Sequence, residues 1–146
     1  CRTQFWQEIV FLPVVRRQEL EHREKVEEVI DFLGLQHYRD QFVRSLPYGV
    51  RKVVELARAL ATEPKLLMLD EPSSGLNVEE TQDMAFWIRD IRQQLGITLL
   101  MVEHDMKLVA DVSDRVLALN DGRVIAEGSP SSVQDTADVV KAYLGE

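Results

Sequence analysis

The stretch LLMLDEPSSGLN, residues 66–77, decides the fold class of this chain. Its four apolar residues, Leu66–Leu69, are typical of a short strand that is buried on both faces of a sheet. The run ends in two adjacent acids, Asp70 and Glu71, after which a proline and small residues break the strand. Because open α/β sheets bind ligands beyond the carboxyl ends of their strands, this stretch predicts an α/β protein with a polar site at that end.

The two acids suit two different tasks. An aspartate suits a hard cation such as Mg²⁺. Neighbouring residues of a strand point to opposite faces, so Asp70 and Glu71 are not expected to share a role. One carboxylate can serve a metal while the other polarises a water. A plain strand end with acids at its turn is the alternative that these residues leave open.

A histidine follows a second apolar run. Residues Ile97–Val102 predict another buried strand, and His104 comes directly after it, next to Glu103. Parallel strands end at one edge of a sheet, so we expect His104 to lie near the two acids. A lone histidine is more often structural, and only its convergence with the acids favours function. Glu103 is interpreted as structural rather than catalytic.

A third segment, SLPYG at residues 45–49, precedes a helix predicted from Val50 to about Thr62. A glycine at a helix start lets a ligand approach free backbone N–H groups, and the helix N-terminus favours an anion such as phosphate. Arg51 and Lys52 add positive charge. Many helices follow a glycine, so this segment alone is a weak signal.

The rest of the chain frames these segments. A helix is expected over 19–33, ended by Gly34, and residues 1–20 also suggest a short amphipathic helix broken at Pro13. Further expected elements are a helix capped by Asn77 that runs to Leu95 and stops at Gly96, a helix over 105–112, strands over 115–119 and 124–127 around a turn at 120–123, a short helix after Ser129-Pro130, and a last helix ending near Leu144. This order predicts a parallel core sheet with an antiparallel addition.

Composition narrows the function classes. The chain has 146 residues, is 45% hydrophobic and 29% charged, and carries a net charge of −8, with basic residues spread along it. This is typical of a globular protein and argues against general nucleic-acid binding. The single cysteine, Cys1, cannot form an internal disulfide, so a reducing compartment is expected. No apolar run approaches the roughly 20 residues that span a bilayer, and no signal peptide is visible.

In this order and spacing, the segments resemble the nucleotide-binding domain of ABC transporters. Leu66–Asp70 resembles the Walker B strand, with Glu71 at the catalytic-base position, and His104 resembles the switch histidine. The signature motif is matched by Leu46, Pro47, Tyr48, Gly49 and Val50, and the D-loop by Ser74, Gly75, Leu76 and Asn77. The LPYG signature, the EHDM after the second strand and the ending AYLGE look most like the branched-chain amino-acid importers, a group that includes amide and urea importers.

The resemblance implies a fold, a reaction and partners. The fold would be the C-terminal part of a P-loop NTPase domain, at residues 64–146, with a helical signature subdomain at 1–63. ATP and Mg²⁺ would be bound, with Asp70 holding the metal, Glu71 and His104 catalytic, and Leu46–Val50, Ser74, Gly75 and Asn77 contacting the nucleotide. The partners would be a second nucleotide-binding subunit in a head-to-tail dimer, permease subunits and, indirectly, a substrate-binding protein, but no nucleic acid. The location would be the cytoplasmic face of the cell membrane.

Two departures from the family pattern matter. The signature serine and first glycine are replaced by Pro47 and Tyr48, and no P-loop string G-x-x-x-x-G-K-[ST] occurs in the 146 residues. The chain starts with Cys1 and has the character of the C-terminal part of a longer protein. We therefore expect it to bind ATP weakly, not to turn it over, and to self-associate. A non-transport ABC ATPase and a non-catalytic interaction fragment are the alternatives.

Overall fold

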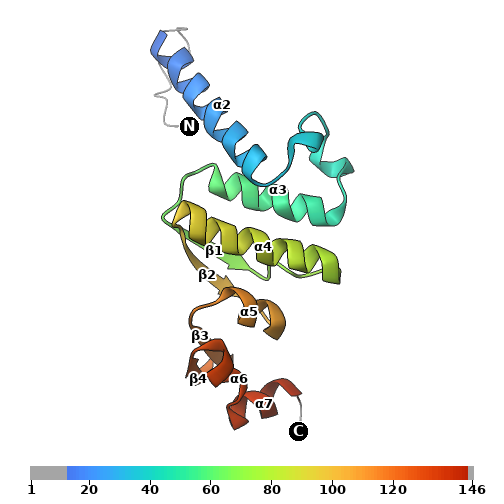
Figure 1. Ribbon diagram of the computed structural model, residues 1–146, viewed down its shortest axis with the longest axis vertical. Coiled ribbons are helices and arrows are strands. Elements are labelled where there is room, and N and C mark those ends of the chain that lie inside the picture. The colour runs from blue at the N-terminus through green and yellow to red at the C-terminus, as the bar shows by residue number, and fades with distance from the viewer. Residues whose placement is uncertain (1–12, 145–146) are drawn as a thin grey trace. The chain divides into compact units, whose positions relative to one another are not determined.

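The computed structural model describes residues 13–144, which divide between Lys65 and Leu66 into two compact units. The first unit contains α2 (Pro13–Phe32), the short 3-10 helices η1 (Gln36–Tyr38) and η2 (Val43–Ser45), and α3 (Tyr48–Leu60). The second contains every strand of the described part of the chain and the helices α4 to α7 (Figure 1).

Helix α2 extends six residues further toward the N-terminus than the predicted 19–33. Its first described residue is Pro13, and proline is tolerated in the first turn of a helix because its missing N–H has no partner there. Gly34 follows with a left-handed φ of 67°, as expected for a helix end. The amphipathic helix expected before Pro13 lies outside the described residues.

Helix α3 begins at Tyr48, two residues before the predicted start at Val50. Gly49 is therefore inside the first turn, where it is buried. The helix is strongly amphipathic and buries Leu56 and Leu60. Within this unit, α2 contacts α3, and Lys25 of α2 pairs with Glu63 just beyond α3 at 2.5 Å.

The second unit opens with two parallel strands joined by a helix. Strand β1 (Leu66–Asp70) pairs with β2 (Thr98–Val102), so that Asp70 lies opposite Val102 at the carboxyl ends. The connection is α4 (Val78–Leu95). Its start is a capping box in which the side chain of Asn77 accepts from the N–H of Glu80 and the side chain of Glu80 accepts from the N–H of Asn77. Gly96 ends it with a left-handed φ of 64°, as predicted.

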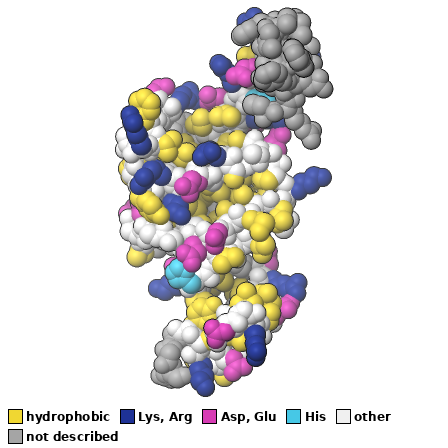
Figure 2. All heavy atoms as spheres, turned by 180° about the vertical axis from the view of Figure 1, so that it is seen from behind, with side chains coloured by type: hydrophobic (Ala, Val, Ile, Leu, Met, Phe, Trp, Pro, Cys, Tyr) yellow, Lys and Arg dark blue, Asp and Glu magenta, His cyan; other side chains and the backbone are white. Residues whose placement is uncertain are grey.

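The sequence prediction that both strands are buried on both faces is wrong for this chain. Side chains on one face of the sheet are exposed, at 51% for Leu66, 69% for Met68, 52% for Leu100 and 62% for Val102. The other face is covered: Leu67 is buried in β1, and α4 buries Met84, Ala85, Ile88 and Ile91. The apolar run correctly indicated a strand, but residues 66–144, the described part of the second unit, leave its open face exposed. Figure 2 shows hydrophobic side chains gathered on the surface of the molecule on the side opposite to the view of Figure 1.

The hairpin is a separate sheet rather than an addition to the parallel one. Strands β3 (Val116–Asn120) and β4 (Arg123–Gly128) pair only with each other among the described residues. Asp121 and Gly122 both have left-handed φ angles, 48° and 73°, as a tight two-residue hairpin turn requires. The predicted strands and turn are therefore confirmed, and the antiparallel pair forms a sheet of its own among the described residues.

Three further helices complete the unit: α5 (Met106–Val112), α6 (Pro130–Gln134) and α7 (Ala137–Leu144). A small core beside the hairpin is formed by Ala118, Val133 and Val139. Across residues 13–144, no helix combines the length and apolarity needed to cross a bilayer.

Candidate active site at the strand ends

Glu71 lies one residue beyond the end of β1. Its backbone is in the left-handed region, with φ of 42°, and its N–H donates to the carbonyl of Val102 at 2.9 Å. Glu71 therefore lies outside the strand. The expectation that Asp70 and Glu71 point to opposite faces as neighbouring strand residues does not apply to it. A left-handed glutamate costs on the order of 1 kcal/mol, and residues in such conformations cluster at functional sites.

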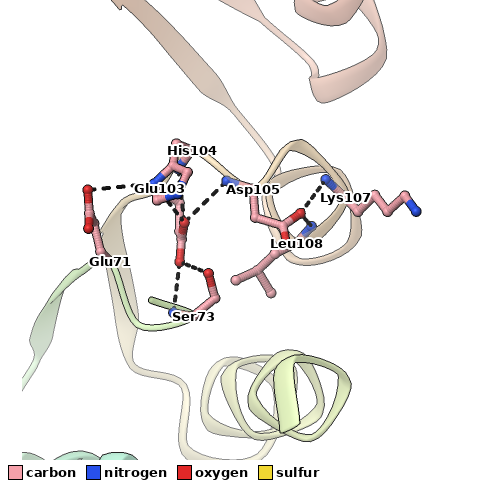
Figure 3. A network of polar contacts seen from close by, with 7 residues as sticks. All are labelled: Glu71, Ser73, Glu103, His104, Asp105, Lys107 and Leu108. Atoms are coloured by element: carbon pink, nitrogen blue, oxygen red, sulfur yellow. Dashed lines mark hydrogen bonds and ion pairs between the residues drawn. The ribbon is translucent and has the colours of Figure 1, made fainter. Parts of the chain in front are cut away.

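His104 lies beside Glu71, as its position after the neighbouring parallel strand predicted. The ring nitrogen Nδ1 of His104 is 3.5 Å from Oε1 of Glu71 (Figure 3). Both side chains are more than half exposed, so a small polar ligand can reach them. A carboxylate and an imidazole that face each other can share the binding of a water or an anion.

Asp70 is the last residue of β1 and is exposed. Among residues 13–144, there is no group of three or more His, Cys, Asp or Glu side chains that could hold a metal ion unaided. Mg²⁺ commonly binds through one or two carboxylates together with substrate phosphates and water. The single carboxylate of Asp70 fits that donor set rather than a metal site made by the protein alone.

Glu103 is the centre of the polar network between the strand ends. Its side chain is 0% exposed. It accepts hydrogen bonds from the Ser73 N–H at 2.8 Å and the Ser73 hydroxyl, and from the N–H groups of His104 at 2.9 Å and Asp105 at 3.3 Å. Burial alone would raise the pKa of the Glu103 carboxyl, but these hydrogen bonds, led by the Ser73 hydroxyl, hold the pKa below its ordinary value.

The sequence did not predict that Glu103 joins two segments that are far apart in the chain. Glu103 was expected to be structural, but its bond to Ser73 spans 30 residues of sequence, which no local pattern reveals. The available signal was an acid between an apolar run and the histidine. The network continues into α5, where the Asp105 carboxylate accepts from the N–H groups of Lys107 at 2.9 Å and Leu108 at 3.1 Å.

The loop after Glu71 contains the predicted contacts Ser74, Gly75 and Asn77. The Ser74 N–H donates to the Glu71 carbonyl at 3.1 Å, and Gly75 has a left-handed φ of 77°. The Asn77 side-chain oxygen is already occupied by the α4 cap. A ligand contact at Asn77 would have to leave that cap intact or replace it.

The segment Leu46–Val50 belongs to the first unit. Leu46 and Gly49 are buried, Val50 is half-buried, and Pro47 and Tyr48 are exposed. Pro47 is the N-cap of α3, and no side chain caps this helix start. The guanidinium of Arg51 lies 5.4 Å and the ammonium of Lys52 5.9 Å from the centre of the Tyr48 ring, so the helix start is electropositive.

Known proteins resemble this chain closely. The ABC transporter family model matches residues 3–74. The chain is 40% identical over 134 residues to the high-affinity branched-chain amino acid transport ATP-binding protein BraF of Pseudomonas aeruginosa, covering 92% of this chain and 52% of that protein. It is also 38% identical to the high-affinity branched-chain amino acid transport ATP-binding protein LivG of Escherichia coli, again over 92% of this chain and 52% of that protein.

Solved structures agree with this relationship. The ADP conformation of MJ1267, an ATP-binding cassette of an ABC transporter, matches with a TM-score of 0.79 and 33% identity over 86% of this chain and 51% of that one. A nucleotide-free ATP-binding cassette matches over the same shares with a TM-score of 0.78 and 32% identity. The chain thus spans about half the length of the relatives it matches. The fold, the strand-end site and these matches together place the chain in the ABC transporter ATP-binding family.

Proposed function

We propose that this chain is part of the ATP-hydrolysing subunit of an importer for branched-chain amino acids or related amides. The observation that carries the proposal is the pairing of Glu71 with His104, 3.5 Å apart, at the ends of two parallel strands. The substrate class comes from the relatives, which are branched-chain amino acid transport proteins.

In the proposed reaction, Glu71 orients and deprotonates the water that attacks the γ-phosphate. General-base catalysis of this kind contributes roughly 10² to 10⁴-fold in rate. His104 contacts the γ-phosphate and responds to its loss. The exposure of both side chains and their mutual orientation support these roles, since the water and the phosphate must reach both groups.

Asp70 would hold Mg²⁺, largely through water. When bound, the ion would neutralise negative charge on the phosphate oxygens. The exposed position of Asp70 at the end of β1 supports this role. The start of α3 is electropositive and no side chain caps it, which supports contact of Leu46–Val50 with nucleotide phosphate, mainly through backbone N–H groups.

The assembly proposed from the family is a head-to-tail dimer with two ATP molecules at its interface. Leu46–Val50 of one subunit would complete the site of the other, and Ser74, Gly75 and Asn77 would face the partner. In this arrangement, residues 1–63 form the signature subdomain and 64–146 part of the ATPase core. The dimer would act on permease subunits at the cytoplasmic face of the membrane and, through them, on a substrate-binding protein.

The 146 residues contain no P-loop. Such a loop holds the phosphates with backbone N–H groups and a lysine. By itself, the chain is therefore expected to bind ATP weakly and not to hydrolyse it. Hydrolysis of ATP by purified 1–146 that Glu71→Gln abolishes would overturn this expectation.

The functional test is a chimera in which the chain replaces its aligned 134 residues in BraF. We expect the chimera to bind and hydrolyse ATP, and Glu71→Gln to lower hydrolysis by about 10²-fold or more while ATP binding is kept. The matched control is Glu79→Gln, an exposed acid in the first turn of α4. Hydrolysis that survives Glu71→Gln would refute the proposed role.

A second function, that of an interaction module, is favoured by one observation. The open face of the parallel sheet presents Leu66, Met68, Leu100 and Val102 to solvent. Apolar faces of this kind mark sites of protein association. We expect purified chain to self-associate through it, and Met68→Lys to reduce that association. A stable, compact monomer in light scattering would count against this function.

A further inference from the structure

We propose that Glu103 is a positioning residue whose carboxylate joins the two strand-end loops, one oxygen to each loop, and thereby sets the spacing of Glu71 and His104. This inference rests on the proposed function, because that function gives the Glu71–His104 pair its catalytic meaning.

The two oxygens of Glu103 divide the bonds between the loops. Oε1 accepts from the N–H and the hydroxyl of Ser73, in the loop that follows Glu71. Oε2 accepts from the N–H groups of His104 and Asp105, in the loop that follows β2. Figure 3 shows the carboxylate lying between these two backbones. One side chain thus fixes both loops at once.

The bonds act close to the proposed catalytic pair. Ser73 is two residues from Glu71, and the His104 N–H is itself one of the donors. The backbone of Glu71 is held on both sides, since its N–H donates to Val102 and its carbonyl accepts from the Ser74 N–H. A shift of the Ser73 loop therefore moves Glu71 relative to His104.

Only an ionised carboxylate serves both loops in this way. It accepts at both oxygens, with about four lone-pair sites for its four donors. A glutamine of equal size would direct its NH₂ group at one set of N–H donors, and donor would then face donor. Because the Glu103 side chain has no exposed surface, water does not replace the lost bonds.

The test is a double-mutant cycle in the intact 146-residue chain, read by the ring ¹⁵N chemical shifts of His104 at fixed pH. Glu71→Gln is introduced into the wild-type and into the Glu103→Gln background. We expect Glu71→Gln to shift the His104 ring resonances in the wild type, and to produce less than about a third of that shift beside Glu103→Gln. A residue that only adds stability would leave the shift unchanged in variants that remain folded. An equal shift in both backgrounds overturns the proposal.

A second variant keeps the test valid if Glu103→Gln does not fold. Ser73→Ala removes the hydroxyl donor and leaves the Ser73 N–H and the Glu103 charge in place. We expect an intermediate response of His104 to Glu71→Gln in this background, and an unreduced response overturns the proposal. The cycle uses no nucleotide. Lost coupling combined with a Glu71→Gln chimera that still hydrolyses ATP would therefore refute the proposed function and leave the positioning role intact.

Discussion

The strand-end loops and the open face of the parallel sheet lie in the same unit. The polar groups of the loops have their hydrogen-bond partners, whereas the apolar side chains of the open face have no surface from residues 66–144 packed against them. At the loops, the buried carboxylate of Glu103 has four hydrogen-bond donors, and Asp105 and Asn77 cap the helices that follow. Among the described residues, no buried side-chain nitrogen or oxygen lacks a partner. On the open face, by contrast, four large apolar side chains remain exposed.

The difference separates two kinds of interaction. Hydrogen bonds at the strand ends join residues of one unit, so the polar geometry of the site forms within this chain. Burial of an apolar face needs a second surface, which the described residues of this unit do not supply. The site can therefore be well ordered in a chain whose hydrophobic packing is incomplete.

The largest expected effect is a difference in stability between truncating a side chain under the covered face of the parallel sheet and truncating one on its open face. Ile91, on the buried side of α4, has 0% exposure, and Ile91→Ala should destabilise the chain by about 2–5 kcal/mol. Met68→Ala on the open face should change stability by less than about 0.5 kcal/mol. Urea unfolding followed by circular dichroism measures both, at a protein concentration low enough to prevent the self-association expected through the open face. Equal losses would mean that the open face is covered in solution.

Breaking the strand-end network should have the next largest effect. Glu103→Gln leaves buried N–H donors without an acceptor, and we expect a loss of about 1–3 kcal/mol in the free energy of unfolding. The control is Glu79→Gln on the surface of α4, expected within about 0.5 kcal/mol of the wild type. If the two variants were equally stable, the network would contribute nothing measurable.

Asn77 tests whether a predicted ligand contact is first a helix cap. Asn77→Ala removes the acceptor for the Glu80 N–H and should cost about 1 kcal/mol. Asn77→Asp keeps an acceptor at the same place and should retain most of the stability. An alanine variant as stable as the wild type would show that the capping box does not stabilise α4.

The smallest expected effect is a pH dependence from Glu103. Its pKa in the folded chain lies below the ordinary value of 4.5, so the folded state binds fewer protons than the unfolded state between these two values. The stabilisation is therefore fully present above pH 4.5 and is lost as the pH falls through the folded-state pKa. Urea unfolding at several pH values below 6 should show a shallower acid loss for Glu103→Gln. Identical pH profiles for both chains would contradict this prediction.

Local signals in the sequence predicted most elements because their causes are local. The Asn77 cap, the stop at Gly96 and the turn at Asp121-Gly122 each depend on a few neighbouring residues. Helix α3 begins at Tyr48, two residues earlier than predicted, so the buried Gly49 lies inside its first turn. An apolar run indicates a strand whose side chains favour burial, but it does not indicate whether another surface is present to cover them. The exposure of Met68 was therefore not predictable from the sequence.

Part of the candidate site was predictable because the order of the strands along the chain determines which strand ends meet. Two parallel strands end at one edge, which brought Glu71 and His104 together as the chain order indicated. The left-handed backbone of Glu71 and the bond from Ser73 to Glu103 depend on tertiary contacts between distant segments. Neither leaves a mark in the local pattern of residue types.

The most direct measurement of the strand-end geometry is native-state hydrogen exchange of the Ser73, His104 and Asp105 amides in the 146-residue chain. If one buried carboxylate holds both loops, these amides exchange as slowly as those of the β1–β2 ladder, and Glu103→Gln speeds all three together. Exchange in the wild type at the rate of open loop amides, or an effect of Glu103→Gln on only one loop, would contradict this picture.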